Sequence, residues 1–445
     1  MTTLMVRGSA GLSAKDTDHP EYDRLTGLLN REGFAALLQS RMQTSEKQSV
    51  IHLDFEHFGL INQKFGRETG DYILRNTALR LRRLLGNQNS YCRPAGDEFL
   101  ILINASKKED LLASAYDIQV VLERPFQIGS QQISLSANIG IARCPLDSDN
   151  LELLPDLAEC ALRLAKSRQE PVAFFSREFH TEMTRTLDVE QALKSAIQKN
   201  ELEVFLQPKY CFKSGDIVGF EALLRWQDTL LGSVTPQEFV AVAEHSMLGQ
   251  QLDFYVLRTV SELIAERKDL GLFTPPIAIN ITTGHFSDPE LTGNIFAILE
   301  AAGVVPTDIV LEITEGVLME SDGQVAPNLR TLRESGFAIA IDDFGTGYSA
   351  LSYLKFIPAT ELKIDKSFME DIESEQGKAL ISIIINLAKT YNLAVTAEGI
   401  ETEAHHTLLQ GLGCDYGQGY LLSRPLPAQC ALHLLPPSPA PRQLG

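Results

Sequence analysis

The chain has 445 residues, of which 44% are apolar and 22% charged, and these proportions are typical of a folded globular protein with two or three domains. A formal net charge of −19 excludes the broad basic surface that binds nucleic-acid polymers. The longest apolar runs are shorter than the ~20 residues of a membrane helix, the N-terminus lacks the apolar core of a signal peptide, and no C-x-x-C pair occurs, so we expect a cytoplasmic protein without a membrane span.

Composition and periodicity divide the chain into five segments. Residues 1–20 are polar and aperiodic, which predicts a flexible N-terminus, and residues 434–445 form a Pro-rich tail. Two blocks of different rhythm, residues 21–176 and 200–433, predict two domains. Residues 177–199 predict a linker helix, either packed on its neighbours or transmitting a signal, because apolar side chains recur there at near-helical spacing: Phe179, Met183, Leu187, Leu193 and Ile197.

The first block mixes short β-rich runs with helical periods. SVIHLDF, EFLILIN and ISLSANIGIA are typical of strands, whereas TGDYILRNTALRLRRLL and LELLPDLAECALRLAK have the apolar spacing of helices. The stretch YCRPAGDEFLILI predicts an antiparallel hairpin. Together these patterns predict an α/β sandwich.

The second block is more regular, with apolar runs separated by stretches of helical length. Continuous apolar runs suit parallel strands that are buried on both faces. Seven or eight such units in about 235 residues predict a closed (β/α)₈ TIM-like barrel. The runs are EVFLQP, IVGFEALL, PIAINI, IVLEIT, FAIAIDD, TELKID and LAVTAEG.

Polar side chains fall at or near the C-terminal ends of these runs, where the loops of a barrel build its active site. Any one of them could be a helix cap, but buried carboxylates on five or six successive strands need a shared partner. Oxygen donors without Cys or His favour Mg²⁺ or Mn²⁺, and two such ions beside a lysine suit hydrolysis of a phosphate ester. The residues are Glu221, Asn280, Glu312, Asp342, Asp343, Lys363, Glu398 and Gln418.

The motifs around these residues resemble the EAL family of cyclic di-GMP phosphodiesterases over essentially all of residues 200–430. EALLRW, VLEITE, DDFGTGYSALSYL, LKIDKSF, AEGIET and GCDYGQGYLLSRP occur in the family's order. The resemblance implies hydrolysis of cyclic di-GMP to linear pGpG with two Mg²⁺ or Mn²⁺ ions, with catalytic roles for Glu221, Lys363 and Glu398. It implies a metal and water shell formed by Glu221, Asn280, Glu312, Asp342, Asp343, Glu398, Glu401 and Gln418.

The same resemblance implies supporting roles. Gln207, Leu224 and Arg225 correspond to substrate contacts, and the arginine would meet phosphate through its planar fork. Glu315 corresponds to a residue that braces the loop starting at Asp343. We expect this loop, which contains GTGYS, to be a mobile lid and to support a homodimer through the EAL domain.

Motifs in the first block resemble the GGDEF family of diguanylate cyclases across residues 21–176, which implies a fold like that of nucleotidyl cyclase catalytic domains. The motifs are DRLTGLLNREGF, LDFEHFGLINQKFGRETGDYIL, RPAGDEFLIL, ANIGIA and ECALRLAK. The resemblance implies a site for GTP with Mg²⁺ formed by Asp54, Asn62, Asp71, Gly96, Asp97, Glu98 and Lys166.

Departures from the GGDEF pattern weaken the case for synthesis of cyclic di-GMP. Ala95 replaces the first glycine of the signature, Gly59 replaces a phosphate-binding lysine, and Glu170 stands where an arginine is common. GNQN replaces the inhibitory RxxD tetrad, so we expect product feedback to be lost. A weakened cyclase, a GTP-binding regulator and a purely structural domain stay open as roles.

The sequence therefore predicts a cyclic di-GMP phosphodiesterase whose GGDEF-like domain binds GTP and regulates the barrel. Two rival interpretations stay open. One is a bifunctional enzyme that retains cyclase activity. The other is a receptor that binds cyclic di-GMP without turnover, which the complete set of expected metal ligands disfavours.

Overall fold

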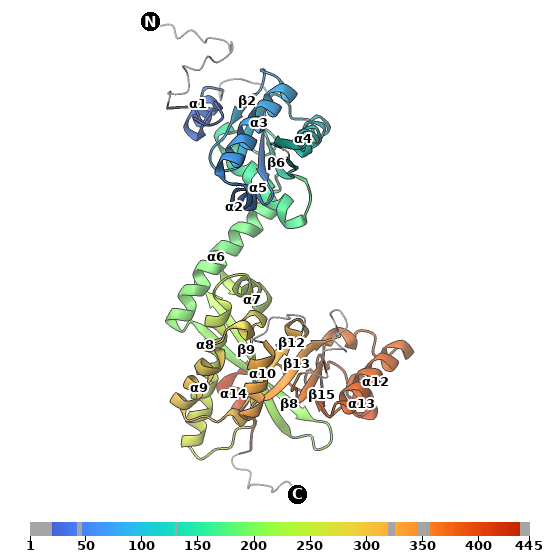
Figure 1. Cartoon of the computed structure of the whole chain (residues 1–445). Helices are drawn as coiled ribbons and strands as arrows, with labels where there is room; N and C mark the ends of the chain where they lie inside the picture. Colours follow the sequence, from blue (N-terminus) through green and yellow to red (C-terminus); the bar gives the residue numbers. More distant parts are fainter. Residues whose placement is uncertain are drawn as a thin grey trace. The chain divides into compact units, whose positions relative to one another are not determined.

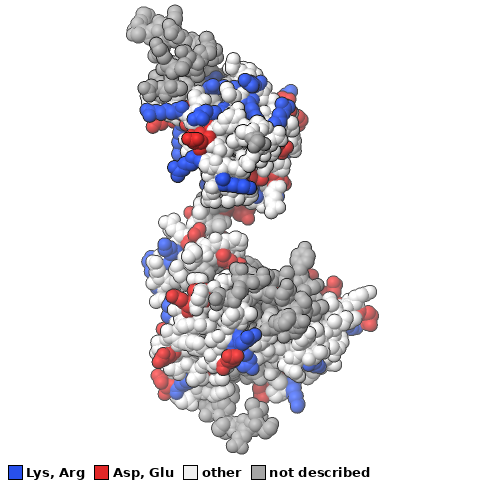
Figure 2. All heavy atoms as spheres, in the orientation of Figure 1, with Lys and Arg blue, Asp and Glu red and all other residues white. Residues whose placement is uncertain are grey.

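The computed structural model describes residues 20–41, 47–129, 131–318, 325–345, 354 and 357–436 (Figure 1). The chain divides into two compact units, and the division falls between Thr184 and Arg185, within helix α6 (Arg177–Lys199). None of the helices in the described ranges is long and apolar enough to cross a bilayer. On the face that Figure 2 shows, acidic and basic side chains are interspersed over the described surface of each unit.

The first unit is built on a five-stranded sheet with the order β2-β3-β1-β6-β7. Strand β1 is antiparallel to β3 and β6, and only β6 and β7 form a parallel pair in this sheet. The predicted hairpin is confirmed as the antiparallel β2–β3 pair. The strands are β1 (Ser49–Phe55), β2 (Ser90–Cys92), β3 (Glu98–Ile103), β6 (Ala137–Arg143) and β7 (Val172–Phe174), beside a two-stranded ribbon of β4 (Phe126–Ile128) and β5 (Gln131–Ile133).

Helices cover both faces of this sheet because the side chains of β1 alternate between two apolar clusters. Ile51, Leu53 and Phe55 pack on one side with residues of α3 and α4. Val50 faces the other side, with residues of α1 and α5. The predicted α/β sandwich is thus confirmed. Its helices are α1 (Arg31–Arg41), α2 (Phe58–Phe65), α3 (Arg67–Leu85), α4 (Lys108–Glu123) and α5 (Leu154–Arg168), with η1 (Leu151–Leu153) preceding α5.

Eight strands of the second unit close into a barrel. Strands β9 and β11 to β16 run parallel, and β8 closes the barrel by pairing with both β9 and β16. The predicted TIM-like barrel is confirmed. The strands are β8 (Leu202–Cys211), β9 (Ile217–Asp228), β11 (Ile277–Asn280), β12 (Ile309–Thr314), β13 (Ala338–Phe344), β14 (Glu361–Ile364), β15 (Ala394–Ala397) and β16 (Tyr416–Gly417), with β10 (Gly232–Val234) and β17 (Leu426–Pro427) paired at the ends.

Helices surround this barrel, as the ribbon in Figure 1 shows. They are α7 (Pro236–Glu244), α8 (Gly249–Asp269), α9 (Leu291–Ala302), α10 (Val325–Glu334), α12 (Glu375–Thr390), α13 (Glu403–Leu412) and α14 (Ala428–Leu432). Short 3₁₀ turns lie in the connections: η2 (Thr283–Ser287), η3 (Pro306–Asp308), η4 (Glu315–Leu318) and η5 (Lys366–Met369).

Residue size and polarity alternate along the barrel strands. Large aliphatic side chains such as Ile279 and Leu311 belong to the main core cluster with the surrounding helices. Ala278, Val310 and Ala340 form a separate cluster, which occupies inward positions because strand side chains alternate in direction. The narrow lumen therefore accepts small side chains, and polar residues at the remaining inward positions converge on one another.

The barrel departs from a fully parallel arrangement at its first strand. Strand β8 is antiparallel to β9, because only residues 212–216 connect the two. Gly215 turns the chain there with a φ of 75°. A parallel crossover needs a dozen or more residues, so this connection is a hairpin in place of the expected helix.

Helix α6 spans the residues predicted as a linker, but only part of the expected apolar stripe is buried. Leu193 and Ile197 lie in a core cluster of the second unit together with Val189. Leu187, which was expected in this stripe, is 56% exposed, and Val189 is buried instead. Phe179 packs against residues of the first unit. Each end of the helix is thus anchored within its own unit.

Helix α5 lies directly against Gly140, which belongs to strand β6 of the first unit. A Cβ there would lie 2.1 Å from Ala158 O and 2.2 Å from Leu162 N, which are both backbone atoms of α5. Backbone cannot move aside as a flexible side chain can, so only glycine permits this contact.

We expect Gly140→Ala to lower the stability of the first unit by at least about 2 kcal/mol, because the added methyl group forces α5 away from β6. Gly59→Ala is the matched control, since a Cβ at Gly59 meets nothing within 4 Å. Calorimetry of the full chain measures both. Equal melting profiles for the two variants would contradict the tight approach at Gly140.

Candidate active site

A lysine ammonium surrounded by four carboxylates lies inside the barrel. Lys363 is only 1% exposed. Its Nζ lies 2.7 Å from Glu398 Oε1, 2.9 Å from Glu312 Oε1, 3.1 Å from Asp342 Oδ1 and 3.6 Å from Glu221 Oε2. Burial by itself lowers the pKa of Lys363, but the carboxylates, led by Glu221, outweigh burial and raise that pKa well above its usual value. The buried side chain is therefore a charged ammonium.

Strand register brings the members of this ring to one level of the barrel. Asn280 lies opposite Glu312 in the parallel β11–β12 pair. Gln207 lies opposite Glu221 in the antiparallel β8–β9 pair. Lys363 is the third residue of the short strand β14, close to its C-terminal end. Each side chain thus comes from a different strand, which is how a barrel assembles a site from residues far apart in sequence.

A β-bulge brings two consecutive aspartates of β13 to the same site. The register of β13 against β14 shifts between residues 341 and 344, so Asp342 and Asp343 together oppose Lys363. Asp343 has a φ of 53°, in the left-handed region that non-glycine residues seldom adopt. Without the bulge, neighbouring strand residues would point to opposite faces. The strained backbone therefore aims both carboxylates at the site.

Acidic charge exceeds basic charge in this ring. Burial raises the pKa of Glu312 well above its usual value, with Lys363 opposing the effect. Burial, and next the charge of Asp342, raise the pKa of Asp343 to about 6. Burial also raises the pKa of Glu398 to about 8. If all five carboxylates are ionised, they exceed the one ammonium by four negative charges, which is the charge that two divalent cations neutralise.

Two groups of carboxylates are suited to hold a cation. Oxygens of Glu221, Glu312 and Asp342 lie within 4.8 Å of one another, and so do oxygens of Asp342, Asp343 and Glu398. Asp342 belongs to both groups. Glu312 Oε2 is buried and has no hydrogen-bond partner within the described ranges, and a cation would satisfy this otherwise costly atom. The donors are all oxygens, which fits Mg²⁺ or Mn²⁺.

Side-chain amides orient the carboxylate of Glu221. Gln418 Nε2 donates to Glu221 Oε2 at 2.6 Å and to Gln207 Oε1 at 3.1 Å. Asn280 Nδ2 donates to Glu221 Oε1 at 3.3 Å. Gln207 in turn donates to the carbonyl of Ser423 at 3.0 Å. Because Asn280 uses its NH₂ group here, its amide oxygen is left to face a cation.

The remaining residues that the resemblance placed at this site lie at its edge. Arg225 is half-buried, donates to the carbonyl of Leu224 at 2.7 Å, and lies over the ring of Phe205. The side chain of Leu224 packs against the apolar core. Glu401 is exposed and belongs to neither group of carboxylates.

Glu315 contacts the segment that follows β13. It is 6% exposed, and its Oε2 accepts a hydrogen bond from the backbone N–H of Gly345 at 3.1 Å. Residues 346–349 of the GTGYS segment lie outside the described residues, so the predicted lid stays a prediction. The contact ties the end of the bulged strand to η4.

A second buried ion pair occupies inward positions of the barrel and was not predicted from the sequence. Lys209 Nζ lies 2.8 and 2.7 Å from the two carboxylate oxygens of Glu361. Thr396 Oγ1 donates to Glu361 Oε1 at 2.6 Å. Glu361 precedes Lys363 by two residues, so both side chains point into the lumen. The available signal was the alternation of charged and aliphatic residues in ELKI.

In the first unit, charged residues gather between the end of β1 and the tip of the β2–β3 hairpin. Lys166 Nζ pairs with Asp54 Oδ2. Burial, and next the charge of Asp54, raise the pKa of Asp97. A hydrogen bond from His52 lowers the pKa of Glu98. These groups are more exposed than the ring of the barrel, and Lys166 and Glu98 have side chains that are each 45% exposed.

The expected guanine contacts lie on two consecutive helices of this unit. Asn62 lies on α2 and Asp71 on α3. A Cβ at Gly70 would lie 2.1 Å from Asn62 Oδ1. Because Gly70 has no side chain, the amide of Asn62 can lie against its backbone, next to Asp71.

Arg93 was not singled out in the sequence, yet it holds the hairpin tip. Its Nε and Nη2 donate to the carbonyl of Gly96 at 2.9 and 2.6 Å, and its Nη1 lies 3.0 Å from Asp23 Oδ1. Gly96 has a φ of 54°, which glycine adopts without strain. The position of Arg93 just ahead of the AGDEF motif was the only sequence signal for this role.

Glu312→Gln removes one negative charge from the barrel ring while preserving the shape of the side chain. Because burial and neighbouring carboxylates disfavour the charged form, we expect the metal-free variant to be as stable as the wild type, or more stable by on the order of 1 kcal/mol. We expect most of the Mn²⁺-induced rise in melting temperature to be lost. Calorimetry with and without Mn²⁺ measures both, with exposed Glu300→Gln as control. A destabilised variant with a full Mn²⁺ response would contradict this account.

This chain is similar to known families and proteins. Residues 190–425 match the family model of the EAL domain, and residues 20–171 match that of the diguanylate cyclase GGDEF domain. The chain is 33% identical over 414 residues to the bifunctional diguanylate cyclase/cyclic di-GMP phosphodiesterase MucR of Pseudomonas aeruginosa, covering 92% of this chain and 60% of that protein. It is 30% identical over 410 residues to the cyclic di-GMP phosphodiesterase PdeR of Escherichia coli, covering 91% and 62%.

Solved structures also resemble this chain. The PaMucR phosphodiesterase in complex with c-di-GMP has 36% identity and a TM-score of 0.52, covering 55% of this chain and 99% of that one. The EAL enzyme Bd1971 bound to cAMP and cyclic di-GMP has 26% identity and a TM-score of 0.55, covering 77% and 82%. The chain spans about 60% of the length of these two curated relatives. It belongs to the EAL family, in the tandem form in which a GGDEF domain precedes the EAL domain.

Proposed function

We propose that the EAL unit hydrolyses cyclic di-GMP to linear pGpG with two Mg²⁺ or Mn²⁺ ions. The observation that carries this proposal is the buried ring, in which five carboxylates face one ammonium and Asp342 is shared between two groups of cation ligands. The named activities of the relatives and the c-di-GMP complex of PaMucR support the same substrate.

The residues divide the work as follows. Glu221, Asn280, Glu312 and Asp342 would hold one cation, and Asp342 with Asp343 and Glu398 would hold the other; Gln418, and Glu401 from a position further out, would support the surrounding water. Two divalent cations supply a bridging water of lowered pKa and neutralise the phosphoryl oxygens. Lys363, charged and held by four carboxylates, orients the attacking oxygen through the same ring.

Hydrolysis then needs only the substrate and one water. The water oxygen bonds to phosphorus, one P–O ester bond of the ring breaks, and the leaving oxygen takes a proton to become a hydroxyl. The linear product thus has a hydroxyl at one end, and at its other end the attacked phosphate remains as a monoester. Gln207, Leu224 and Arg225 would hold the substrate, and the half-buried arginine would present its fork to a phosphate.

Glu221→Ala tests this function, because Glu221 contacts Lys363 and accepts from both Gln418 and Asn280. We expect the rate of pGpG formation to fall by at least about 10³-fold. Purified full chain is incubated with cyclic di-GMP and Mg²⁺ or Mn²⁺, and the products are separated; exposed Glu300→Ala should retain activity. Tight binding without pGpG at any metal concentration would establish the receptor in place of the enzyme.

We further propose that the GGDEF unit binds GTP with Mg²⁺ and regulates the barrel. Asp54, Asp97 and Glu98 lie close together around the hairpin tip and Lys166 reaches them, which supports binding of a metal-bound triphosphate. Ala95 adds a methyl group where a phosphate would approach the backbone, and Gly59 lacks the charge of the phosphate-binding lysine it replaces, so both disfavour turnover. The bifunctional name of MucR keeps synthesis as the alternative.

GTP should change the rate of cyclic di-GMP hydrolysis by the wild-type chain and have little effect on Asp97→Asn, which loses a carboxylate at the hairpin tip. The measurement is the hydrolysis rate with GTP, with ATP as the control nucleotide. Formation of cyclic di-GMP from GTP by the Glu221→Ala chain would instead establish the bifunctional enzyme. No effect of GTP and no consumption of it would leave the unit a structural role.

We also propose that the EAL unit forms a homodimer, on the family resemblance of the segment that begins at Asp343. The contact between Glu315 and Gly345 supports a defined path for the start of that segment. Light scattering of the full chain tests the proposal, and a monomer at all concentrations would reject it.

A further inference from the structure

The loop that follows Asn280 begins at the metal site. Asn280 is the last residue of β11, and the next residue, Ile281, donates its backbone N–H to the carbonyl of Glu312 at 3.0 Å. This bond extends the parallel ladder by one step and ties the loop to another residue of the ring. The position of the Asn280 amide therefore depends on how residues 281–287 are held.

A buried aspartate of helix α8 holds this loop. Asp253 is 6% exposed. Its Oδ2 accepts from the backbone N–H of Thr282 at 2.9 Å, and its Oδ1 accepts from Thr282 Oγ1 at 3.0 Å. His285 Nδ1 lies 2.9 Å from Asp253 Oδ2, and because a carboxylate only accepts, the ring donates there. One carboxylate thus accepts three hydrogen bonds from Thr282 and His285, which lie within a four-residue stretch of the loop.

The histidine is kept at this position at a cost in stability. His285 is 1% exposed, and its Nε2 has no partner among the described residues. A buried ring nitrogen without a partner is unfavourable, because it has lost its hydrogen bond to water. An apolar side chain would avoid that cost, but it would also lose the bond to Asp253. A histidine at this position therefore restrains the loop through Asp253, although an apolar side chain would be the more favourable one to bury.

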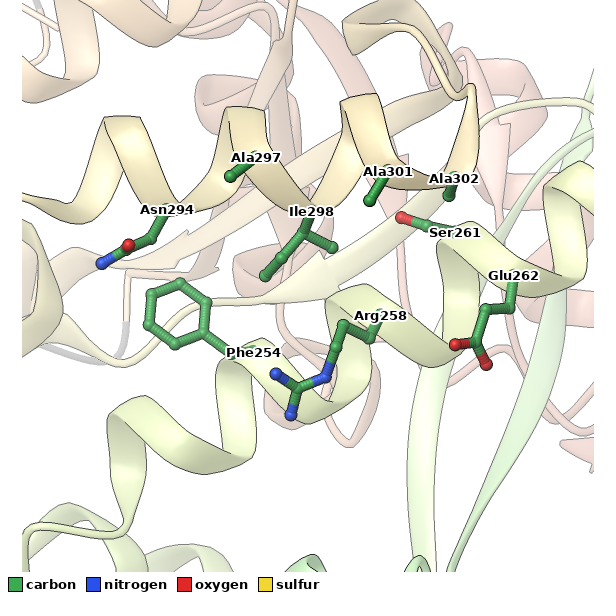
Figure 3. Close-up of a pocket in the computed structure, with 9 residues that line it drawn as sticks. All are labelled: Phe254, Arg258, Ser261, Glu262, Asn294, Ala297, Ile298, Ala301 and Ala302. Atoms are coloured by element: carbon green, nitrogen blue, oxygen red, sulfur yellow. The ribbon is translucent and has the colours of Figure 1, made fainter.

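Two further contacts confine the same loop. The ring of Phe254 meets that of His285 edge to face, with centroids 4.6 Å apart. Figure 3 shows Phe254 beside α9, where it lines a pocket of about 490 Å³ on the outside of the barrel. Asn328 of α10 donates to the carbonyls of Phe286 and Asp288, each at 2.9 Å. Helices on both sides therefore fix the loop, and α8 does so closest to Asn280.

We propose that Asp253 is a positioning residue for the metal site. Through Thr282 and His285 it fixes the loop that starts at Asn280, and so places the Asn280 amide against Glu221 and toward the cation. The role rests on the proposed function, because it concerns the same cation site. Asp253 itself contacts neither substrate nor cation.

The test is the affinity of the full chain for Mn²⁺, measured by calorimetric titration, which needs no turnover. Asp253→Asn preserves the shape of the side chain but removes its charge. A neutral amide oxygen accepts the bonds from the Thr282 N–H and from His285 more weakly than a carboxylate does, and the amide NH₂ can meet Thr282 Oγ1 only by donating to it. We expect Mn²⁺ to bind on the order of tenfold more weakly, the scale on which partners of metal ligands act. Ser261→Ala is the matched control, since Ser261 lies on the same helix (Figure 3), is fully buried, and has a hydroxyl with no hydrogen-bond partner in the described part of the chain.

A double-mutant cycle separates positioning from general loss of structure. If Asp253 acts through Asn280, Asp253→Asn has no further effect on Mn²⁺ affinity in the Asn280→Ala chain. Equal weakening in both backgrounds, no weakening at all, or the same weakening by Ser261→Ala would each overturn the proposal. Should the wild type bind Mn²⁺ but fail to hydrolyse cyclic di-GMP, the proposed function falls while this cycle still decides the role of Asp253.

Thr282 provides a second, milder pair of variants that keeps the proposal testable should Asp253→Asn fail to fold. Thr282→Val deletes only the Oγ1 bond to Asp253 and retains the backbone bond, whereas Thr282→Ser retains both. We expect the valine variant to bind Mn²⁺ several-fold more weakly and the serine variant to bind it like the wild type. Equal affinities for valine and serine would count against positioning.

Discussion

The balance between one buried ammonium and the carboxylates around it is the constraint on which the second unit depends. Lys363 has 1% exposure, and four acidic side chains approach it within 3.6 Å. A single positive charge cannot neutralise the five carboxylates of the ring, so burial and mutual repulsion raise the pKa values of its acids. The carboxylates repel one another, yet the strands hold them in place, so the site is preorganised to bind cations from solution.

The rest of the barrel holds this unfavourable ring in place. Outward aliphatic side chains bury their surface against the helices, which supplies the free energy that the acidic lumen costs. Around the ring, donors restrain the carboxylates: Gln418 and Asn280 hold Glu221, and Glu315 holds the strand end beyond Asp343. The side chains that point outward from the strands thus stabilise the barrel, and those that point into the lumen form the site, because successive side chains of a strand alternate in direction.

The first unit assembles its charged residues differently. Its carboxylates lie at a hairpin tip and a strand end, and Lys166 is already paired with Asp54. The side chain of Glu98 is 45% exposed, so water screens these charges far more than those in the barrel lumen. Such a site gains less from cation binding alone. In the proposed complex with GTP, the nucleotide would bring its own metal and charge, and the extra methyl group of Ala95 would lie where it approaches the backbone.

The order of strand-like and helical segments, the barrel, the hairpin and the acidic residues of the ring could be predicted from the sequence, because spacing and residue type are local properties. Side-chain alternation within IVLEIT or ELKI already separates the core face from the lumen. Tertiary structure alone decided that β8 is antiparallel, that a bulge aims Asp342 and Asp343 together, and that Asp253 lies beneath the loop after Asn280. Those features depend on pairing register and on contacts between residues far apart in the chain, and no local pattern encodes which distant backbone a side chain will meet.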